Sequence, residues 1–391
     1  MVNFFPMKIL TVDIGTGTQD ILLYDSRLDL ENSFKLVVPS PTMMVHRQLQ
    51  QATRRGQPVL LYGVTMGGGP SQWAAEAHIK AGLAVYATPD AARSFNDDLN
   101  KVAQMGICLL SEDEALQLPQ DILRLRLADF DFLAIARAFG LFGVSLVDLD
   151  AVAVAVFDHG DAPPQESDRQ FRFDYLDRRI RAENRLSAFA YRAEDVPLEM
   201  TRLQAVVESA QGVDAPLLVM DSAPAAVLGA TYDPQVALPE RKLIANVGNF
   251  HSLAFRLGAG GIEGVFEHHT GLVDLPKLEH LLRALADGSL THGEVFGDHG
   301  HGALVYSPEA LPLGDGSFDV AVTGPRRGLF KLPPAPGGLR PYLAVPFGDM
   351  MVAGCIGLLS AAADILPELA EQIRASLNQT GHGAAPWEIE S

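Results

Sequence analysis

A turn rich in glycine and threonine follows the first apolar segment of the chain. It reads DIGTGT from Asp13 to Thr18, and a second apolar segment begins shortly after it. Gly15 and Gly17 let backbone N–H groups approach an anion, because no Cβ stands in the way. Thr16 and Thr18 can add hydroxyl donors, and Asp13 can hold a hydrated Mg²⁺ through water. The pattern indicates either a phosphate-binding turn or a tight hairpin whose residues serve turn geometry alone.

Histidines form the second group of residues that could do chemistry. Histidine titrates near neutral pH and is the commonest metal ligand. The chain has 11 histidines, and several of them have glycine neighbours that would allow a ligand to approach. The candidates for a functional site are His159, His251, His269, His299 and His301.

Three interpretations of these histidines stay open. In the first, they line a phosphate site as hydrogen-bond donors or general acid–base groups. In the second, the H-x-H pair of His299 and His301 binds a transition metal together with a carboxylate, although no H-E-x-x-H helix motif accompanies it. In the third, they are structural and satisfy buried carbonyl groups or cap turns.

Two sets of three short apolar runs must position these groups. The runs predict β-meanders over residues 8–38 and 242–266, with turn residues between the strands. Residues 150–157 and 216–220 are nearly all apolar, as strands buried on both faces are. Residues 275–286 have a helical pattern. The sequence therefore predicts an α/β protein in which a meander with helices occurs twice.

The region between the first meander and residue 150 gives a coarser prediction. Residues 58–64 and 83–86 resemble strands, and residues 91–146 are mostly helical by pattern. A pocket for an acceptor substrate is expected within residues 65–160.

The turn at Asp13 resembles the first phosphate loop of a superfamily that contains actin, the 70-kDa heat-shock chaperones, and sugar and acetate kinases. The resemblance lies in the segment KILTVDIGTGTQDILLYD. Further segments resemble that superfamily in the same order along the chain: 151–170, 217–230, 243–255 as the second phosphate loop, 267–282, 320–328 as the adenosine loop, and 352–359.

This resemblance implies a two-lobe actin-like (ribonuclease H-like) α/β fold with a ligand cleft between the lobes. The first lobe would comprise residues 1–231, with a C-terminal helix at 350–377 packing back on it. The second lobe would comprise residues 232–349, and residues 378–391 would form a loose tail.

The resemblance also implies a nucleotide-binding phosphotransferase or ATPase that uses ATP and Mg²⁺. Its acceptor, a small molecule or a protein, is not named by any motif. Asp13 would organise Mg²⁺ through water, and Asp158, with His159 beside it, would be the catalytic base. The residues expected to bind phosphate or nucleotide are Gly15, Thr16, Gly17, Thr18, Asn246, Gly248, Asn249, His251, His269, Thr270, Gly271 and Gly324.

Two positions depart from the superfamily pattern. Asn246 stands where the second phosphate loop usually begins with aspartate, and an amide neither acts as a base nor attracts a cation strongly. Pro325 follows Gly324 where a second glycine is usual, and proline lacks a backbone N–H. A degenerate nucleotide site, another phosphorylated ligand and a lost site are therefore all open. So are a metal-dependent or cofactor-handling protein, and a non-catalytic, nucleotide-driven activator of a protein partner.

Within this superfamily the chain is similar to an uncharacterised group labelled pyruvate formate-lyase-activating proteins. A radical enzyme with a three-cysteine iron–sulfur cluster is excluded, because the chain has two cysteines, Cys108 and Cys355. Both cysteines lie in apolar stretches, which predicts buried thiols.

The charge of the chain bears on its partners. With 30 Lys and Arg against 48 Asp and Glu, the formal net charge is −18. Such a surface repels nucleic-acid backbones and anionic lipids, so neither is an expected partner. No apolar stretch is long enough to span a membrane, and the first residues do not have the pattern of a secretory signal. We expect a cytoplasmic protein.

Overall fold

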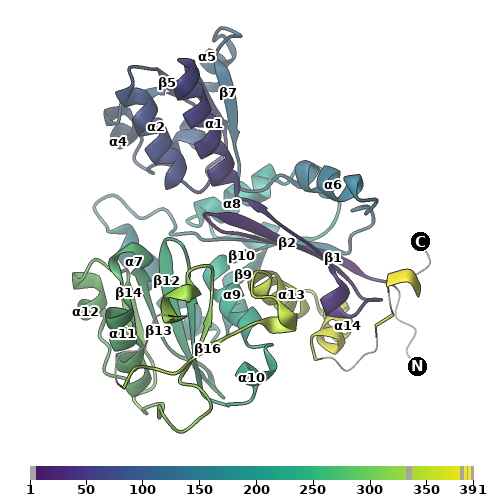
Figure 1. Ribbon diagram of the computed structural model, residues 1–391. Coiled ribbons are helices and arrows are strands. Elements are labelled where there is room, and N and C mark those ends of the chain that lie inside the picture. The colour runs from purple at the N-terminus through teal and green to yellow at the C-terminus, as the bar shows by residue number, and fades with distance from the viewer. Residues whose placement is uncertain (1–5, 332–336, 379–382, 385, 389–391) are drawn as a thin grey trace.

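The computed structural model describes residues 6–331, 337–378, 383–384 and 386–388. Within these residues the chain forms two six-stranded sheets and one four-stranded sheet. The small sheet and its helices stand apart from the two large sheets, at the top of Figure 1.

The first sheet joins a meander to parallel strands, in the order β3–β2–β1–β8–β10–β9. Strands β1, β2 and β3 are antiparallel neighbours, and β8 runs parallel to both β1 and β10. The bounds are β1 Lys8–Ile14, β2 Thr18–Asp25, β3 Phe34–Pro39, β8 Ala151–Val156, β9 Ala190–Arg192 and β10 Leu217–Asp221. Every residue of β8 is buried, which confirms the prediction of a strand covered on both faces.

The second sheet repeats this plan in the order β14–β13–β12–β11–β15–β16. Strands β11, β12 and β13 form an antiparallel meander, and β15 runs parallel to β11 and β16. The bounds are β11 Lys242–Val247, β12 His251–Gly258, β13 Gly261–His269, β14 Gly302–Val305, β15 Val320–Thr323 and β16 Pro341–Leu343.

A three-stranded meander followed by parallel strands thus occurs twice in the chain. This doubled arrangement is the expected two-lobe actin-like (ribonuclease H-like) α/β fold, and the predicted fold class is confirmed. We call the first sheet with its helices the first lobe, and the second sheet with its helices the second lobe. The lobe boundaries at residues 231 and 349 stay predictions.

The third sheet lies between β3 and β8 in the sequence and has its own hydrophobic core. Its strands are all parallel, in the order β6–β5–β4–β7. Its elements are α1 Pro41–Arg55, β4 Val59–Gly63, α2 Pro70–Lys80, β5 Val85–Ala87, α3 Pro89–Arg93, α4 Leu99–Gln104, β6 Cys108–Leu109, α5 Glu112–Leu116 and β7 Leu123–Leu127. The mostly helical pattern predicted for 91–146 is wrong at β6 and β7. The thiol of Cys108 is exposed rather than buried, whereas Cys355 is buried as predicted.

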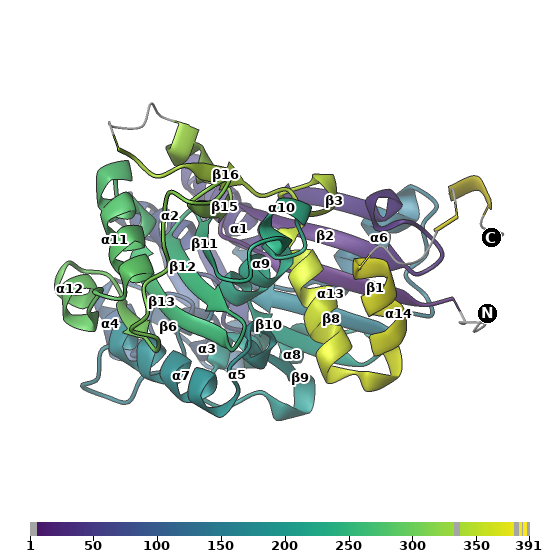
Figure 2. The same ribbon diagram turned by 90° about the horizontal axis from the view of Figure 1, so that it is seen from below.

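The remaining helices cover the two large sheets. In Figure 2, α13 and α14 lie across the first sheet, and α11 and α12 flank the second. The bounds are α6 Phe132–Leu141, α7 Asp168–Ala182, α8 Thr201–Ser209, α9 Ser222–Ala230, α10 Pro234–Ala237, α11 Leu275–Asp287, α12 His292–Gly297, α13 Ala353–Ile365 and α14 Pro367–Leu377. Among the described residues, a search for helices with the length and apolar character of a membrane span finds none.

Helices α9 and α13 cross at backbone contact. A Cβ on Gly357 would stand 1.8 Å from the carbonyl oxygen of Ala225, and one on Gly229 would stand 1.7 Å from that of Ala353. Only glycine permits this approach. The close crossing brings the start of α13 and the start of α9 to the space between the lobes.

Part of the expected tail 378–391 lies outside the described residues. Within the described part, Gly383 donates its backbone N–H to the carboxylate of Asp29 (2.9 Å), and Ala384 donates to the carbonyl of Arg27 (2.7 Å).

Candidate functional site

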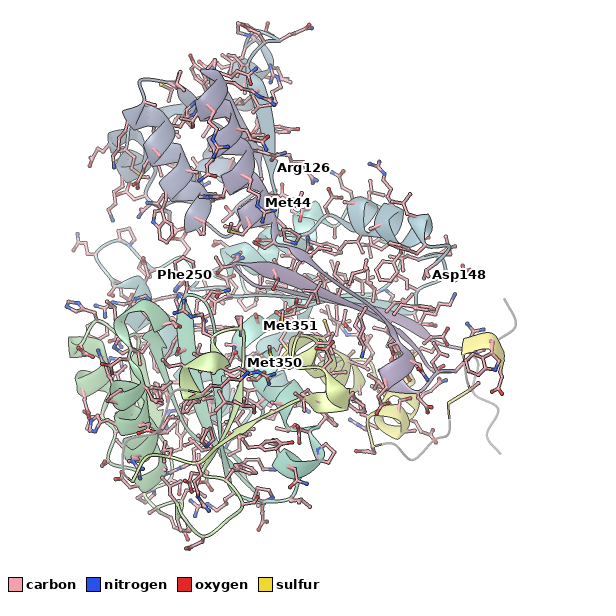
Figure 3. All side chains as sticks on the ribbon, viewed as in Figure 1. Met44, Arg126, Asp148, Phe250, Met350 and Met351 are labelled. Carbon is pink, nitrogen blue, oxygen red and sulfur yellow. The ribbon has the colours of Figure 1, made fainter. Side chains whose placement is uncertain are left out.

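A cavity of about 120 Å³ lies between the two lobes. The turn between β1 and β2 forms one wall, and the turn between β11 and β12 forms the other. The end of β15 and the start of α13 complete it, and Figure 3 shows Phe250, Met350 and Met351 around this space. Of the residues predicted from the sequence, those that line it are Asp13, Gly15, Thr16, Gly17, Thr18, Asn246, Gly248, Asn249, His251 and Gly324.

The two turns have the same construction. The N–H of Gly15 donates to the carbonyl of Thr18, and the N–H of Gly248 donates to the carbonyl of His251, both at 2.9 Å. The turns also face each other closely, since a Cβ on Gly17 would stand 2.9 Å from the side-chain nitrogen of Asn249. An anion between them would meet backbone N–H groups from both lobes.

Two carboxylates stand at the base of the first turn. Asp13 and Asp20 are direct cross-strand partners in the β1–β2 register. Asp13 accepts a hydrogen bond from the hydroxyl of Ser222 (2.7 Å), and desolvation raises the pKa of Asp13 to about 6. Burial and the charge of Asp13 raise the pKa of Asp20 to about 8. One oxygen of Asp20 is buried without a hydrogen-bond partner among the described residues.

Helix α13 reaches Asp13 through a glycine. A Cβ on Gly354 would stand 1.9 Å from a carboxylate oxygen of Asp13, so a larger residue would push the helix or the carboxylate away. The crossing of α9 and α13 therefore sets the position of Asp13, with Ser222 on one side and Gly354 on the other.

The loop after β15 lies against the start of the second turn. Gly324 has a φ of 94°, and a Cβ there would stand 2.4 Å from the side-chain oxygen of Asn246. The N–H of Arg326 donates to the carbonyl of Val247 (2.9 Å). Asn246 thus contacts the loop that resembles an adenosine loop, and Pro325 lines the cavity beside it.

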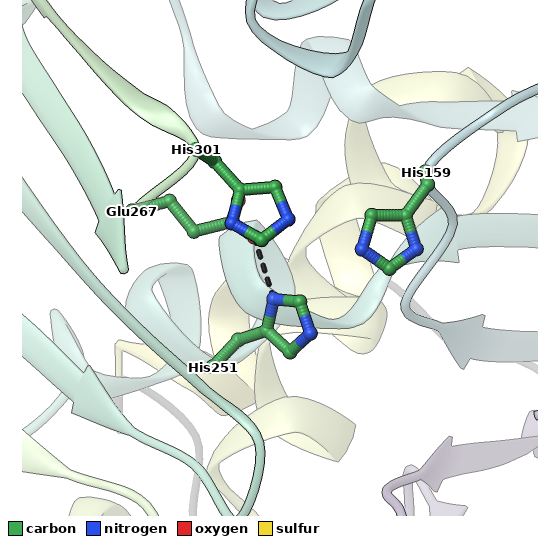
Figure 4. A group of neighbouring side chains, drawn as sticks. All are labelled: His159, His251, Glu267 and His301. Atoms are coloured by element: carbon green, nitrogen blue, oxygen red, sulfur yellow. Dashed lines mark hydrogen bonds and ion pairs between the residues drawn. The ribbon is translucent and has the colours of Figure 1, made fainter. Parts of the chain in front are cut away.

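Three predicted histidines and one glutamate form a second group beside this cavity. His159, His251, Glu267 and His301 each offer one metal-ligating atom, and these atoms lie within 4.8 Å of one another. The ring of His159 lies 5.1 Å from that of His251 and 5.3 Å from that of His301, between centroids. Figure 4 shows His159 on one side and the rings of His251 and His301 on the other. We call these four residues the histidine cluster.

Glu267 connects this cluster to a buried arginine of the first lobe. One oxygen of Glu267 accepts a hydrogen bond from Nδ1 of His251 (2.7 Å), and the other accepts from Nε of Arg172 (2.6 Å). Arg172 also donates to Asp221 (2.7 Å) and to the backbone carbonyl of Asp158 (2.7 Å). The side chains of Arg172, Asp221 and Glu267 are at most 1% exposed.

The charges of this group follow from its burial. Burial opposes ionisation of Glu267, but Arg172 and neighbouring histidines hold its pKa well below the usual range. Burial lowers the pKa of His301 to about 3, and burial together with His251 and His301 holds the pKa of His159 well below the usual range. The rings of His159 and His301 are therefore neutral near pH 7 and keep a lone pair each.

Asp158, the expected catalytic base, does not line the cavity. Its two carboxylate oxygens accept hydrogen bonds from the backbone N–H groups of Gly160 and Leu203, both at 2.8 Å. Burial raises its pKa despite these bonds. Its carboxylate anchors the first turn of α8 to the loop after β8.

Four further predicted residues lie outside the cavity wall. His269 is half-buried, with its ring 4.6 Å from that of His301. Burial and His251 lower the pKa of His269 to about 4. The hydroxyl of Thr270 lies 2.9 Å from that of Ser252, whereas Gly271 is exposed. His299 is exposed with a φ of 65°, and it is not part of the histidine cluster.

Asp20, Glu267 and Arg172 are absent from the residues predicted as a site. Asp20 could have been found from hairpin register, because a turn at residues 15–17 pairs position 13 with position 20. Glu267 could have been found from strand alternation, because it shares a face of β13 with His269, whose partner on β12 is His251. No local pattern signals Arg172, which is a buried charge in the middle of a charged helix.

Comparison with known proteins identifies a family and a set of solved structures. No curated protein matches the chain. A ROK hexokinase from Thermus thermophilus is 13% identical with a TM-score of 0.23, and the match covers 66% of this chain and 47%, about half, of the hexokinase. The activator of the 2-hydroxyisocaproyl-CoA dehydratase from Clostridium difficile, with bound ADPNP, is 9% identical with a TM-score of 0.32. The match covers 97% of this chain and 100% of the activator. An exopolyphosphatase-like protein is 11% identical with a TM-score of 0.24, and the match covers 72% of this chain and 59% of that protein.

One family model covers more than half of the chain. It spans residues 66–329, which include β5, β6 and β7 of the third sheet, the second turn of the cavity and all four members of the histidine cluster. The chain therefore belongs to the family described as "Putative pyruvate format-lyase activating enzyme (DUF1786)".

Proposed function

We propose that the chain binds ATP with Mg²⁺ in the interlobe cavity and transfers or hydrolyses the terminal phosphoryl group. The observation that carries this proposal is the pair of matched glycine turns, one from each lobe, that face each other across the cavity. Each turn has the same closing hydrogen bond, at 2.9 Å. A chain of phosphates placed between them would be held by backbone N–H groups from both sides.

The donor groups near the first turn fit Mg²⁺. This ion prefers carboxylate oxygen and water over nitrogen ligands. Asp13 and Asp20 supply oxygen ligands, and Asp20 has a buried oxygen that lacks a partner among the described residues. These two residues would hold the ion, which when bound would neutralise charge on the phosphates. A bound cation would in turn favour the ionised forms of Asp13 and Asp20, whose pKa values are raised mainly by burial.

The loop after β15 would receive the nucleoside. Gly324, Met350 and Met351 line the cavity there, and methionine side chains adapt to flat apolar groups. The amide of Asn246 would give a weaker interaction with a cation than a carboxylate would. We therefore expect slow turnover rather than loss of nucleotide binding.

The family description names an activating enzyme. In this chain, slow hydrolysis coupled to closure of the lobes would suit a nucleotide-driven activator of a protein partner. Two cysteines do not suffice for the three-cysteine cluster of a radical activating enzyme.

Calorimetric titration of MgATP and MgADP into the untagged protein tests the proposal. We expect micromolar affinity, about −8 kcal/mol. Asp13→Asn should weaken binding by tenfold or more in the presence of Mg²⁺, because an amide is a poorer partner for the ion. Asp148→Asn is the matched control, since Asp148 is exposed and far from the cavity in Figure 3.

Two outcomes would contradict the proposal. One is the absence of any heat of binding with the wild-type protein. The other is equal affinity for MgATP in the wild type and Asp13→Asn, which would remove the first turn from the site.

A further inference from the structure

We propose that His159, His251 and His301 bind a divalent transition-metal ion at the junction of the two lobes, with Glu267 behind them orienting two of the rings. This site goes beyond the nucleotide site proposed above. It also differs from the pair of His299 and His301 expected from the sequence, because the side chain of His299 is exposed and outside the cluster.

The three rings come from three separate parts of the chain. His159 lies on the loop after β8 in the first lobe, His251 begins β12, and His301 precedes β14 in the second lobe. In Figure 4 the rings of His251 and His301 lie between Glu267 and His159. One ligand atom from each of the four residues, Glu267 included, lies within 4.8 Å of the others, whereas ligands of a tetrahedral ion lie about 3.3 Å apart. Side-chain movements of about an ångström would close this difference.

Glu267 determines which ring nitrogens are free. A carboxylate only accepts hydrogen bonds, so the proton of His251 sits on Nδ1, which donates to Glu267 at 2.7 Å. Nδ1 of His301 faces the same oxygen at 3.5 Å. Both rings therefore turn Nδ1 toward Glu267 and their Nε2 edge away from it. A carboxylate behind a ligating imidazole is the usual arrangement in metal sites, because it holds the ring and its tautomer.

The cluster is incomplete without a further partner. Nδ1 of His301 is buried and has no hydrogen-bond partner among the described residues. A single carboxylate oxygen is the nearest acceptor for two imidazole rings. The centroids of the three rings lie within 5.3 Å of one another. A purely structural network of buried histidines would satisfy these nitrogens. A metal ion would bind the free lone pairs of the rings and hold their Nδ1 atoms toward Glu267.

The surrounding charge favours a cation. The carboxylate of Glu267 faces the Nδ1 atoms of His251 and His301 at 2.7 and 3.5 Å, and a second buried carboxylate, that of Asp221, shares Arg172 with it. Imidazole ligands select zinc, iron, nickel or copper over magnesium and calcium. Three protein ligands leave one coordination position for water or a substrate.

The test uses the full-length, untagged protein after dialysis against EDTA. Zn²⁺ is titrated in the calorimeter, and Co²⁺ is titrated with the visible absorption spectrum as the readout. We expect one equivalent of each ion to bind and a spectrum typical of a nitrogen-ligated Co²⁺ site. His159→Ala should weaken Zn²⁺ binding at least 100-fold. His159 is chosen because it is half-buried on a loop, whereas His301 is buried and its removal would also disturb packing.

Two control variants define the site. His280→Ala removes an exposed histidine that bonds only to Glu294 in the described structure, and it should leave Zn²⁺ affinity unchanged. His299→Asn, which tolerates the positive φ, should also leave it unchanged. The proposal is overturned if no stoichiometric Zn²⁺ or Co²⁺ binding occurs. It is equally overturned if His159→Ala, with an unchanged melting temperature, binds Zn²⁺ as the wild type does.

MgATP is titrated into the same metal-free protein as a separate measurement. Nucleotide binding in the absence of Zn²⁺ binding would overturn the metal site alone, and the reverse result would overturn the nucleotide site alone.

Discussion

A single buried side chain, that of Arg172, joins the two lobes through charge. It lies on α7 of the first lobe and bonds to Glu267 of the second lobe and to Asp221 at the end of β10. Its guanidinium also lies 4.0 Å from the ring centre of Phe157, which lines the cavity. The arginine thus holds together elements that carry both the nucleotide cavity and the histidine cluster.

We expect Arg172→Met to lower the free energy of unfolding by about 3–5 kcal/mol, because it leaves two buried carboxylates without their cation. Urea denaturation followed by circular dichroism measures the change. Arg181→Met is the control, since Arg181 makes an exposed ion pair with Asp177 on the same helix and its replacement should leave stability close to that of the wild type. Equal stability of Arg172→Met and the wild type would show that the buried charges do not stabilise the junction.

The role of Asp158 can be separated into stability and catalysis. Asp158→Asn replaces one acceptor oxygen by an N–H donor facing a backbone N–H, either that of Gly160 or that of Leu203. We expect a loss of about 1–3 kcal/mol of stability from the unsatisfied group. If Asp158 is also the base predicted from the resemblance, ATP turnover falls far more than the fraction of folded protein does. Turnover that stays in proportion to the folded fraction would remove the catalytic role.

Site residues can be predicted from the sequence where they lie close together in the chain. The turn from Asp13 to Thr18 and the segment from Asn246 to His251 are both short, and both line the cavity. The histidine cluster is different, because its members are brought together by strand pairing and by the meeting of two lobes. The positions of Asp158, His251 and His269 after predicted strands suggest that these three residues converge. They do not show that His159, Glu267 and His301 would group with His251, or that His299 would stay outside.

At the scale of elements, the crossing of α9 and α13 determines the geometry of the cavity. Gly229 and Gly357 allow the helices to touch backbone to backbone, and Gly354 lets α13 approach Asp13. The helix pair also bridges the cores, because α9 contacts strands of both large sheets.

We expect Gly357→Ala to destabilise the protein by more than about 3 kcal/mol, because its Cβ would stand 1.8 Å from a backbone oxygen that cannot move alone. Thermal unfolding measures the effect. Gly293→Ala is the control within an exposed helix, with nothing within 4 Å of the added Cβ. There alanine should stabilise by about 0.5–1 kcal/mol. Similar melting temperatures for the two variants would contradict the tight crossing.

The elements that were predicted and those that were missed differ in length and pattern. Strand β8 is a continuous run of six buried apolar residues, and four of the six residues of β11 are buried, so both segments stand out in the sequence. In the third sheet, β5 overlaps the strand predicted at residues 83–86, whereas β6 has only two residues, which is too short for any period to emerge. Strand β7, LRLRL, alternates as a strand should, but its helical neighbours masked the signal. Its partners in the sheet are distant in sequence, and only their pairing identifies it.

At the scale of the whole molecule, the third sheet reaches the cavity through one aromatic contact. The ring of Trp73 on α2 lies 5.6 Å from the ring of Phe250, which is part of the second turn. The N-terminal end of α2 is close as well, since a Cβ on Gly69 would stand 3.3 Å from the Phe250 ring. A ligand held by the second turn would therefore alter the surroundings of Trp73.

This contact provides an optical test of nucleotide binding. The chain has two tryptophans, and Trp387 is 84% exposed. In Trp387→Phe we expect MgATP to change the fluorescence emission of Trp73. The change should disappear in Trp387→Phe with Phe250→Leu, which removes the aromatic contact. Binding detected by calorimetry without any change in Trp73 emission would show that the third sheet does not respond to the ligand.

The placement of the histidine cluster across the two lobes has a thermodynamic consequence. His159 comes from one lobe and His251 and His301 from the other, so the affinity for an ion there would depend on the relative position of the two lobes. His251 also lines the cavity. If lobe position affects both affinities, then the factor by which nucleotide alters metal affinity must equal the factor by which metal alters nucleotide affinity. With reciprocity of this kind, the metal concentration would set the affinity of the protein for nucleotide, and the nucleotide concentration would set its affinity for the metal.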